Sequence, residues 1–175
     1  MEKLFFEAFK SLKLKKNLSD LFEDVIVSKI SATNRKDLVK IYIRSTHLIP
    51  KRDIYAVETE IKKQIFEGPA IEAHFIEEYH LSDSYTPKTL IDEYIDSMYT
   101  ELTECNRVME NALKKVEFKE LNATTLEVSL PDLEIIRARE HEILEYLSKV
   151  VNERCNLNAS FVVSFHDSPI YSHNR

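Results

Sequence analysis

The side chains that could do acid–base chemistry or hold a metal are spread along the chain. Acid–base catalysis needs two carboxyl groups in different environments, whereas the acidic pairs here fall on predicted exposed helix faces or strand ends. A metal site needs converging ligands, and the histidines form neither an HxH nor an HExxH motif. We therefore predict no catalytic residue, no cofactor and no metal ligand. The groups weighed are Glu77 and Glu78, Asp92 and Glu93, Glu140 and Glu142, and the histidines His47, His74, His80, His141, His166 and His173.

Glycine is nearly absent from the sequence, with Gly68 as its single occurrence in 175 residues. Phosphate-binding loops and the GxxG clamp of KH domains need glycine, because its backbone can approach a ligand closely. The sequence therefore excludes a P-loop, a Rossmann turn and a KH-type RNA clamp. Gly68 itself suits a position just past the end of a helix.

One group of side chains is a candidate binding surface. Residues 38–45 alternate, so Lys40, Tyr42 and Arg44 face one side and apolar residues face the other. Basic side chains interleaved with an aromatic ring can bind an acidic protein segment or single-stranded nucleic acid. The same pattern also suits a merely solvated strand face. The candidate partner-binding face comprises Lys29, Arg35, Lys36, Lys40, Tyr42, Arg44, Lys51 and Arg52.

The composition is that of an ordinary soluble globular protein, 43% hydrophobic and 31% charged. No apolar run approaches the roughly 20 residues that span a bilayer, so we expect no membrane partner. Acidic residues near the N-terminus disfavour a signal peptide. Cys105 and Cys155 lie far apart in sequence and are interpreted as reduced thiols, which places the protein in the cytoplasm.

Charge is distributed unevenly along the chain. Residues 1–66 contain 14 basic and 9 acidic side chains, whereas residues 67–104 contain 1 basic and 10 acidic side chains. The formal net charge is −6. Phosphate repels a net-acidic protein, so wrapping duplex DNA is disfavoured, although the first third can still present a positive face.

The elements predict an α+β protein in which the order helix, strand, strand, helix, strand occurs twice, over residues 2–80 and 87–166. In both copies a hairpin precedes a helix that returns to a third, parallel strand, so each unit should be a three-stranded sheet covered by helices. This order resembles the type II KH module in topology alone, without its GxxG loop. The elements expected in the first copy are a helix over 4–12, a turn of helix over 19–22, strands over 24–32 and 38–45, a helix with an apolar stripe over 54–65, and a strand over 70–79.

The second copy begins with Thr86 as helix cap and Pro87 at the first helical position. Its apolar stripe runs to about residue 114, either as one helix or as two broken near Cys105 and Asn106. Asp132 is expected to cap a long second helix that Asn156-Leu157-Asn158 terminates. The strands expected here lie over 115–120 and 124–130 and around Phe161, Val163 and Phe165. The predicted domains are 1–83 and 84–168, followed by a loose tail or linker at 169–175.

Three stretches resemble a known family when they are taken together. They are residues 35–51 (RKDLVKIYIRSTHLIPK), 79–87 (YHLSDSYTP) and 151–156 (VNERCN). They are similar to the N-terminal region of the PolC-type DNA polymerase III alpha subunit, the replicative polymerase of low-GC Gram-positive bacteria. The likeness runs over about residues 1–166.

The resemblance implies two small N-terminal domains that precede an OB domain, a PHP domain with an inserted proofreading exonuclease, and the polymerase. In that family these N-terminal domains are thought to make protein contacts, notably with the tau subunit of the clamp loader. The polymerase and exonuclease acids belong to other segments, so no catalytic residue transfers. The resemblance also implies the remainder of the polymerase chain as a partner, and DNA only indirectly through the parent enzyme, which performs DNA-directed DNA synthesis.

Two functional hypotheses follow from the residues and the resemblance. The leading one is a non-catalytic replisome docking module, and the alternative is a single-stranded nucleic-acid-binding module that uses the basic hairpin face. Catalysis by the chain alone ranks third, since no site supports it. Whether the chain is an excised piece, a fragmentary gene product or a stand-alone relative stays open at this point.

Overall fold

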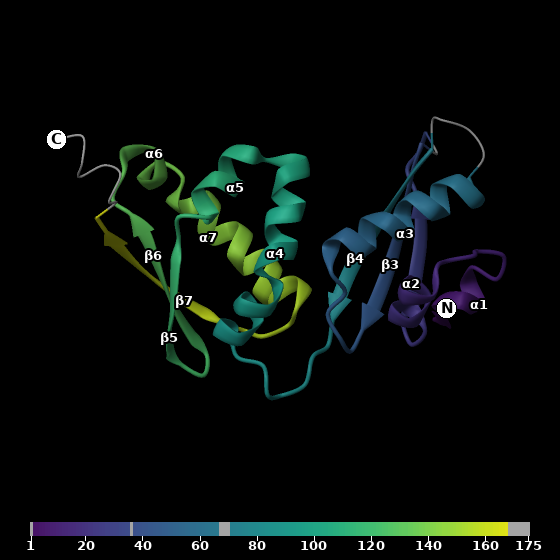
Figure 1. Cartoon of the computed structure of the whole chain (residues 1–175), viewed down its shortest axis with the longest axis horizontal. Coiled ribbons are helices and arrows are strands. Elements are labelled where there is room, and N and C mark those ends of the chain that lie inside the picture. The colour runs from purple at the N-terminus through teal and green to yellow at the C-terminus, as the bar shows by residue number, and fades with distance from the viewer. Residues whose placement is uncertain (1, 36, 67–70, 168–175) are drawn as a thin grey trace. The chain divides into compact units, whose positions relative to one another are not determined.

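The computed structural model of the chain describes residues 2–35, 37–66 and 71–167. It divides into two compact units, Met1–Ser82 and Asp83–Arg175, and each is described here by itself (Figure 1). Each unit contains one small mixed sheet with helices, so the predicted α+β class is confirmed. Lys36, Gly68 and the predicted tail at 169–175 lie outside the described residues.

The first unit has a sheet with strand order β1-β2-β3-β4. β2 and β3 form the predicted antiparallel hairpin, and β4 pairs parallel to β3 after the connection through α3. The expectation of three strands is wrong by one, because the N-terminal residues extend along β2 as a short antiparallel strand. The elements are β1 Lys3–Leu4, α1 Phe5–Ala8, α2 Lys16–Phe22, β2 Ile26–Ala32, β3 Leu38–Ser45, α3 Lys51–Gln64 and β4 Glu72–Tyr79.

An aromatic cluster explains why the helix expected over residues 4–12 is cut to one turn. The Phe5 N–H donates to the Val25 carbonyl at 2.8 Å, which holds the turn against the sheet. The Phe5 ring is fully buried and lies 4.8 Å from the Phe22 ring and 6.1 Å from the Phe75 ring, measured between centroids. Burial of these rings outweighs the helical spacing of the segment, because tertiary packing overrides local propensity.

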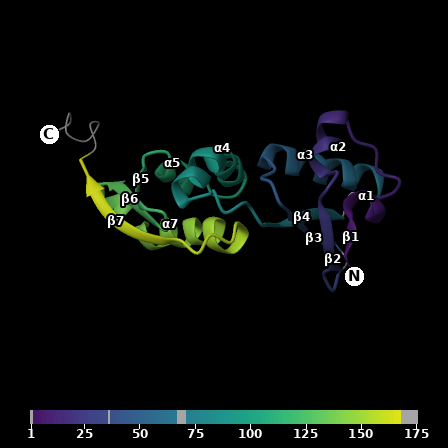
Figure 2. The ribbon, with the colours of Figure 1, turned by 90° about the horizontal axis from the view of Figure 1, so that it is seen from below.

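The helices of the first unit cover one face of its sheet. Figure 2 shows α2 and α3 on the same side of the strands. The covered face carries the apolar positions of β3, which pack with the apolar stripe of α3 to form a closed core. The fully or almost fully buried residues of that core include Ile41, Ile43, Ile54, Val57 and Ile61.

The second unit has a sheet with strand order β5-β6-β7, in which β5 and β6 are antiparallel and β6 and β7 are parallel. Thr86 caps α4 and Pro87 begins it, as predicted, and Thr89 completes a reciprocal capping box with Thr86. The elements are α4 Pro87–Cys105, α5 Arg107–Leu113, β5 Glu117–Asn122, β6 Thr125–Pro131, α6 Glu134–Arg137, α7 Glu140–Ser148, the π-helix η1 Lys149–Arg154 and β7 Ser160–His166.

The long apolar stripe of this unit is two helices, because Asn106 is extended at φ −161° and its side chain accepts the Met109 N–H at 3.1 Å. The prediction that Asp132 caps a long helix is wrong. Leu133 occupies the cap position of the short α6, and the Asp132 carboxylate instead accepts the Arg137 Nε–H at 2.6 Å.

The π-helix ends at two asparagines in left-handed backbone conformation. Asn156 has φ 58° and Asn158 has φ 55°. Asparagine tolerates this conformation better than most residues other than glycine. The prediction that this segment terminates the helix is therefore confirmed, and no glycine is needed there.

Candidate partner-binding surface

The face of the first sheet opposite α2 and α3 forms the candidate surface, here called the open face. Strand register sets its composition, since side chains at paired positions lie beside one another on the same side of a sheet. Ile26 pairs with Arg44 and Arg44 with Glu78; Lys29 pairs with Tyr42 and Tyr42 with Ile76. The open face comprises Leu4, Ile26, Lys29, Lys40, Tyr42, Arg44, His74, Ile76 and Glu78.

The alternation of β3 brings Lys40, Tyr42 and Arg44 to this face, and their half-buried side chains alternate with buried neighbours. Lys29 joins them from β2 after a bulge at Ser28. The Lys29 Nζ lies 5.4 Å from the centroid of the Tyr42 ring, within the range of a cation–π contact. One aromatic side chain and three cations thus lie together on two neighbouring strands.

Arg44 is already ion-paired within the chain. Its guanidinium donates two hydrogen bonds to the Glu2 carboxylate, at 2.6 and 3.0 Å. These bonds lower the pKa of Glu2. The positive charge of Arg44 is therefore largely compensated, and Lys29 and Lys40 carry most of the basic character of the open face.

Lys51 does not belong to the open face, contrary to its predicted place in the binding surface. Its side chain is 6% exposed and its Nζ lies 2.9 Å from a carboxylate oxygen of Glu77, whose side chain is 3% exposed. The interpretation of Glu77 as an exposed acid is wrong for the same reason. Lys51 starts α3 directly after Pro50, and this position directs it toward β4 beneath the helix.

The remaining predicted residues lie away from the centre of the open face. Arg52 follows Lys51 in α3 and its side chain is 81% exposed, so it extends from the helix-covered side of the unit. Arg35 is exposed in the turn between β2 and β3. Lys36 lies outside the described residues. The predicted cluster thus separates into a central group on the open face and outlying cations.

Sequence reasoning missed the contribution of β4 to this surface. The parallel register places His74 beside Lys40, Ile76 beside Tyr42 and Glu78 beside Arg44. Ile76 is 42% exposed and Leu4 is 41% exposed, which gives the face an apolar component as well as both signs of charge. The alternation within residues 72–79 is the only sequence signal, and it does not reveal which strand lies next to β4.

A buried carboxylate lies on the covered side of β4. The Phe75 N–H donates to Oε2 of Glu58 at 2.7 Å, so this carboxylate satisfies an amide at the outer edge of the sheet. Burial raises the pKa of Glu58, and this effect is larger than the lowering by the hydrogen bond from Phe75 and by the nearby His74 and Lys51 side chains. Its role is structural, because it accepts a hydrogen bond from a main-chain amide of β4, the strand against which it packs.

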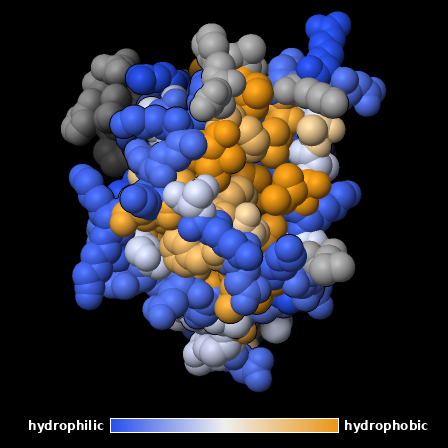
Figure 3. Space-filling model, turned by 90° about the vertical axis from the view of Figure 1, so that its right-hand side faces the viewer, coloured by the Kyte–Doolittle hydropathy of each residue, from blue (hydrophilic) through white to orange (hydrophobic). Residues whose placement is uncertain are grey.

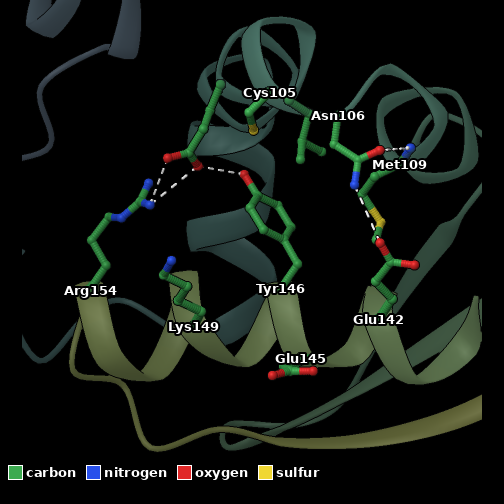
Figure 4. A pocket seen from close by; sticks show the side chains of 10 residues that line it. Cys105, Asn106, Met109, Glu142, Glu145, Tyr146, Lys149 and Arg154 are labelled. Atoms are coloured by element: carbon green, nitrogen blue, oxygen red, sulfur yellow. Dashed lines mark hydrogen bonds and ion pairs between the residues drawn. The ribbon is translucent and has the colours of Figure 1, made fainter.

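The second unit contains a pocket of about 300 Å³ between its helices. Figure 4 shows Tyr146 and Arg154 extending from α7 and η1, with Cys105, Asn106 and Met109 on the opposite wall. The Tyr146 hydroxyl donates to Glu101 at 2.7 Å, and Arg154 donates to the same carboxylate at 2.9 and 3.2 Å.

The network of Glu101, Tyr146 and Arg154 in this pocket has a structural role. Glu101 is neutralised by Arg154 and hydrogen-bonded by Tyr146, so it is a poor general base. Burial, followed by the Glu101 charge, raises the pKa of Tyr146 and keeps the phenol protonated. Sequence reasoning did not identify these residues, since Glu101 lies 45 and 53 positions from its partners and no local motif joins them.

Neither a metal-binding cluster nor a membrane-spanning helix occurs among the described residues. No group of three or more His, Cys, Asp or Glu side chains in residues 2–35, 37–66 and 71–167 is arranged to hold a metal ion. Within the same ranges, no helix combines the length and the apolar character that a membrane crossing requires.

Comparison with known proteins identifies the first unit. Residues 4–74 match the family model described as DNA polymerase III polC-type N-terminus I. This range extends from β1 through the hairpin and α3 into β4, so it includes most of the open face. No curated protein and no solved structure matches the chain. Over residues 4–74, the chain is therefore similar to the N-terminus I region of PolC-type DNA polymerase III.

Proposed function

We propose that this chain is a non-catalytic docking region of a cytoplasmic replicative DNA polymerase of the PolC type. On this proposal residues 1–83 and 84–168 correspond to the two N-terminal domains of that enzyme, and the rest of the polymerase chain is a further partner. The tau subunit of the clamp loader is the docking partner. DNA synthesis and proofreading belong to other segments of the parent enzyme, which holds the DNA.

The observation that carries the proposal is the open face of a unit that matches the PolC N-terminus I family. This face combines an aromatic ring, exposed apolar side chains and charges of both signs, a mixture typical of protein–protein interfaces. The two half-exposed apolar residues, Leu4 and Ile76, give it groups that gain free energy when a partner excludes water.

Single-stranded nucleic acid is the second candidate, and the contact of Lys29 with Tyr42 favours it. Two observations favour a protein partner instead. Glu2 compensates the charge of Arg44, and the register places Glu78 on the same face, where it repels phosphate.

Calorimetric titration of the whole chain with the carboxy-terminal region of tau tests the proposal. We expect binding, and we expect Ile76→Glu to weaken it by about tenfold or more, as a charge placed within a desolvated interface does. Ile135→Glu is the matched control, because Ile135 is 61% exposed in the second unit. Absence of a complex at tens of micromolar, or equal losses from both substitutions, contradicts the proposal.

The nucleic-acid alternative has its own measurement. Fluorescence anisotropy with a labelled oligothymidylate should show no binding at physiological salt if docking is the function. Binding that falls steeply with salt and disappears in Lys40→Glu with Arg44→Glu would establish the alternative.

A further inference from the structure

The two edges of the first sheet are protected to different extents. At the β4 edge, the Phe75 N–H already donates a hydrogen bond to the Glu58 carboxylate. At the opposite edge, β1 pairs only with Ile26 and Val27 of β2. No other strand of the described residues pairs with β2 on that side, so its second half presents an open edge. Open edges are ready templates for another strand.

The hairpin geometry shows which main-chain groups face outward. The Thr33 N–H donates to the Leu38 carbonyl at 3.0 Å, so Thr33 points its polar groups toward β3. Inward and outward positions alternate along an antiparallel strand. Ile30 and Ala32 therefore direct their N–H and C=O groups away from β3, whereas Ser31 directs its own toward β3.

A groove lies along this open edge. It has a volume of about 370 Å³ and is lined by Ala8, Val27, Ser28 and Ile30 together with Lys3 and Lys29. Ile30 is 50% exposed, although it pairs with the fully buried Ile41. Figure 3 shows apolar surface gathered on the side of the molecule that carries α1, α2 and β2, with hydrophilic side chains around it.

The charges around the groove indicate what kind of segment can bind there. Lys3 and Lys29 are both exposed, and neither makes an ion pair with another described residue. Two copies of this edge would bring like-charged lysines together, which opposes pairing of the chain with itself. Carboxylates on an incoming strand would gain from both lysines.

We propose that the open edge of β2 binds an extended acidic segment of a partner protein as an additional strand. An apolar side chain of the segment covers Ile30, carboxylates face Lys3 and Lys29, and the main chain bonds to Ile30 and Ala32. Main-chain bonds supply affinity and alternate side chains supply selectivity in this mode of recognition. This inference rests on the proposed docking function and names the chemistry of the partner segment.

Hydrogen exchange provides the sharpest test, with the tau carboxy-terminal region as the probe. In the free chain we expect the Ile30 and Ala32 amides to exchange rapidly and the Ser31 amide to be protected. In the complex, Ile30 and Ala32 should become protected by about tenfold or more, because each then donates a hydrogen bond. A complex in which their exchange stays unchanged overturns the inference and leaves the docking function intact.

Substitutions separate the contributions of backbone and charge. Ile30→Pro removes an outward N–H without removing a bond to β3, so it should weaken binding by about tenfold while the chain stays folded. Lys3→Glu with Lys29→Glu should weaken binding by a similar factor at low salt, while Lys63→Glu, an exposed lysine of α3, serves as control. Affinities within twofold of the original for both edge variants overturn the inference.

Two further outcomes are distinguishable. If the unaltered chain binds no tau fragment, the docking function fails and the inference fails with it. If sedimentation shows a dimer that Ile30→Pro dissociates, the occupant of the edge is a second copy and the acidic partner segment is wrong.

Discussion

The ammonium of Lys51 lies 2.9 Å from one carboxylate oxygen of Glu77 and 3.1 Å from the other, and both side chains are almost completely buried. This ion pair joins the first turn of α3 to the covered face of β4. A buried pair of this kind is costly to break from one side, since the remaining charge has no compensation.

The first prediction concerns this pair. Lys51→Met should lower the free energy of unfolding by about 3–5 kcal/mol, because Glu77 stays buried without a counter-charge. The double variant Lys51→Met with Glu77→Leu should recover most of that loss, since it removes both charges. Urea denaturation followed by circular dichroism measures the change, and Lys63→Met is the exposed control on the same helix. A single variant as stable as the control would contradict the prediction.

The second prediction concerns the pH dependence set by Glu58. Burial raises the pKa of Glu58 above its ordinary value, so the folded chain binds a proton more tightly at this site than the unfolded chain. Stability from this group is therefore present below the unfolded pKa and is lost as pH rises through the raised folded pKa.

Glu58→Gln should abolish this part of the pH dependence, since an amide oxygen can still accept the Phe75 N–H and does not titrate in this range. Unfolding free energies of both forms, measured at a series of pH values above the ordinary carboxyl pKa, should diverge in favour of the glutamine form. Parallel curves would show that Glu58 titrates alike in the folded and unfolded chains.

The third prediction concerns the left-handed asparagine at the end of η1. Asn156 has φ 58°, a conformation that disfavours residues with an ordinary Cβ. Asn156→Ala should cost roughly 1–2 kcal/mol more unfolding free energy than Asn156→Gly, because both remove the side chain but only glycine lacks the Cβ penalty. Thermal melts of the two variants give the comparison. Equal melting temperatures would mean that the side chain of Asn156, and not its backbone, determines the effect.

The fourth prediction concerns the network in the pocket of the second unit. Arg154 and Glu101 have side chains only 11% and 17% exposed, so Arg154→Met leaves a largely desolvated carboxylate and should cost about 2–4 kcal/mol. Tyr146→Phe removes one hydrogen bond to Glu101 and should cost about 1 kcal/mol. Denaturant titration distinguishes the two, and a larger loss from Tyr146→Phe would contradict the assignment of Arg154 as the main partner.

Local patterns predicted the elements well because they act within one strand or one helix. The alternation in β3 correctly divided Lys40, Tyr42 and Arg44 from the buried residues, and the Thr86 cap with Pro87 located the start of α4. These signals depend on neighbouring residues, so a single sequence contains them.

Features that depend on distant residues were not predictable. The sequence alone predicts Lys51 to be a surface lysine, and the parallel pairing of β3 and β4 places Glu77 opposite it. The same pairing adds His74 and Ile76 to the open face. The short β1 forms because it pairs with β2, and a strand of two residues is too short to show a periodic pattern in the sequence.

The parallel pairing of β3 and β4 also has a consequence for the order of events during synthesis on the ribosome. The hairpin can form as soon as β3 has emerged, but β4 follows only after the whole of α3. Until Tyr79 leaves the exit tunnel, the first sheet lacks an entire edge strand and the ion pair between Lys51 and Glu77 is not formed. Nascent chains that stall within α3 should therefore be the ones most readily captured by chaperones.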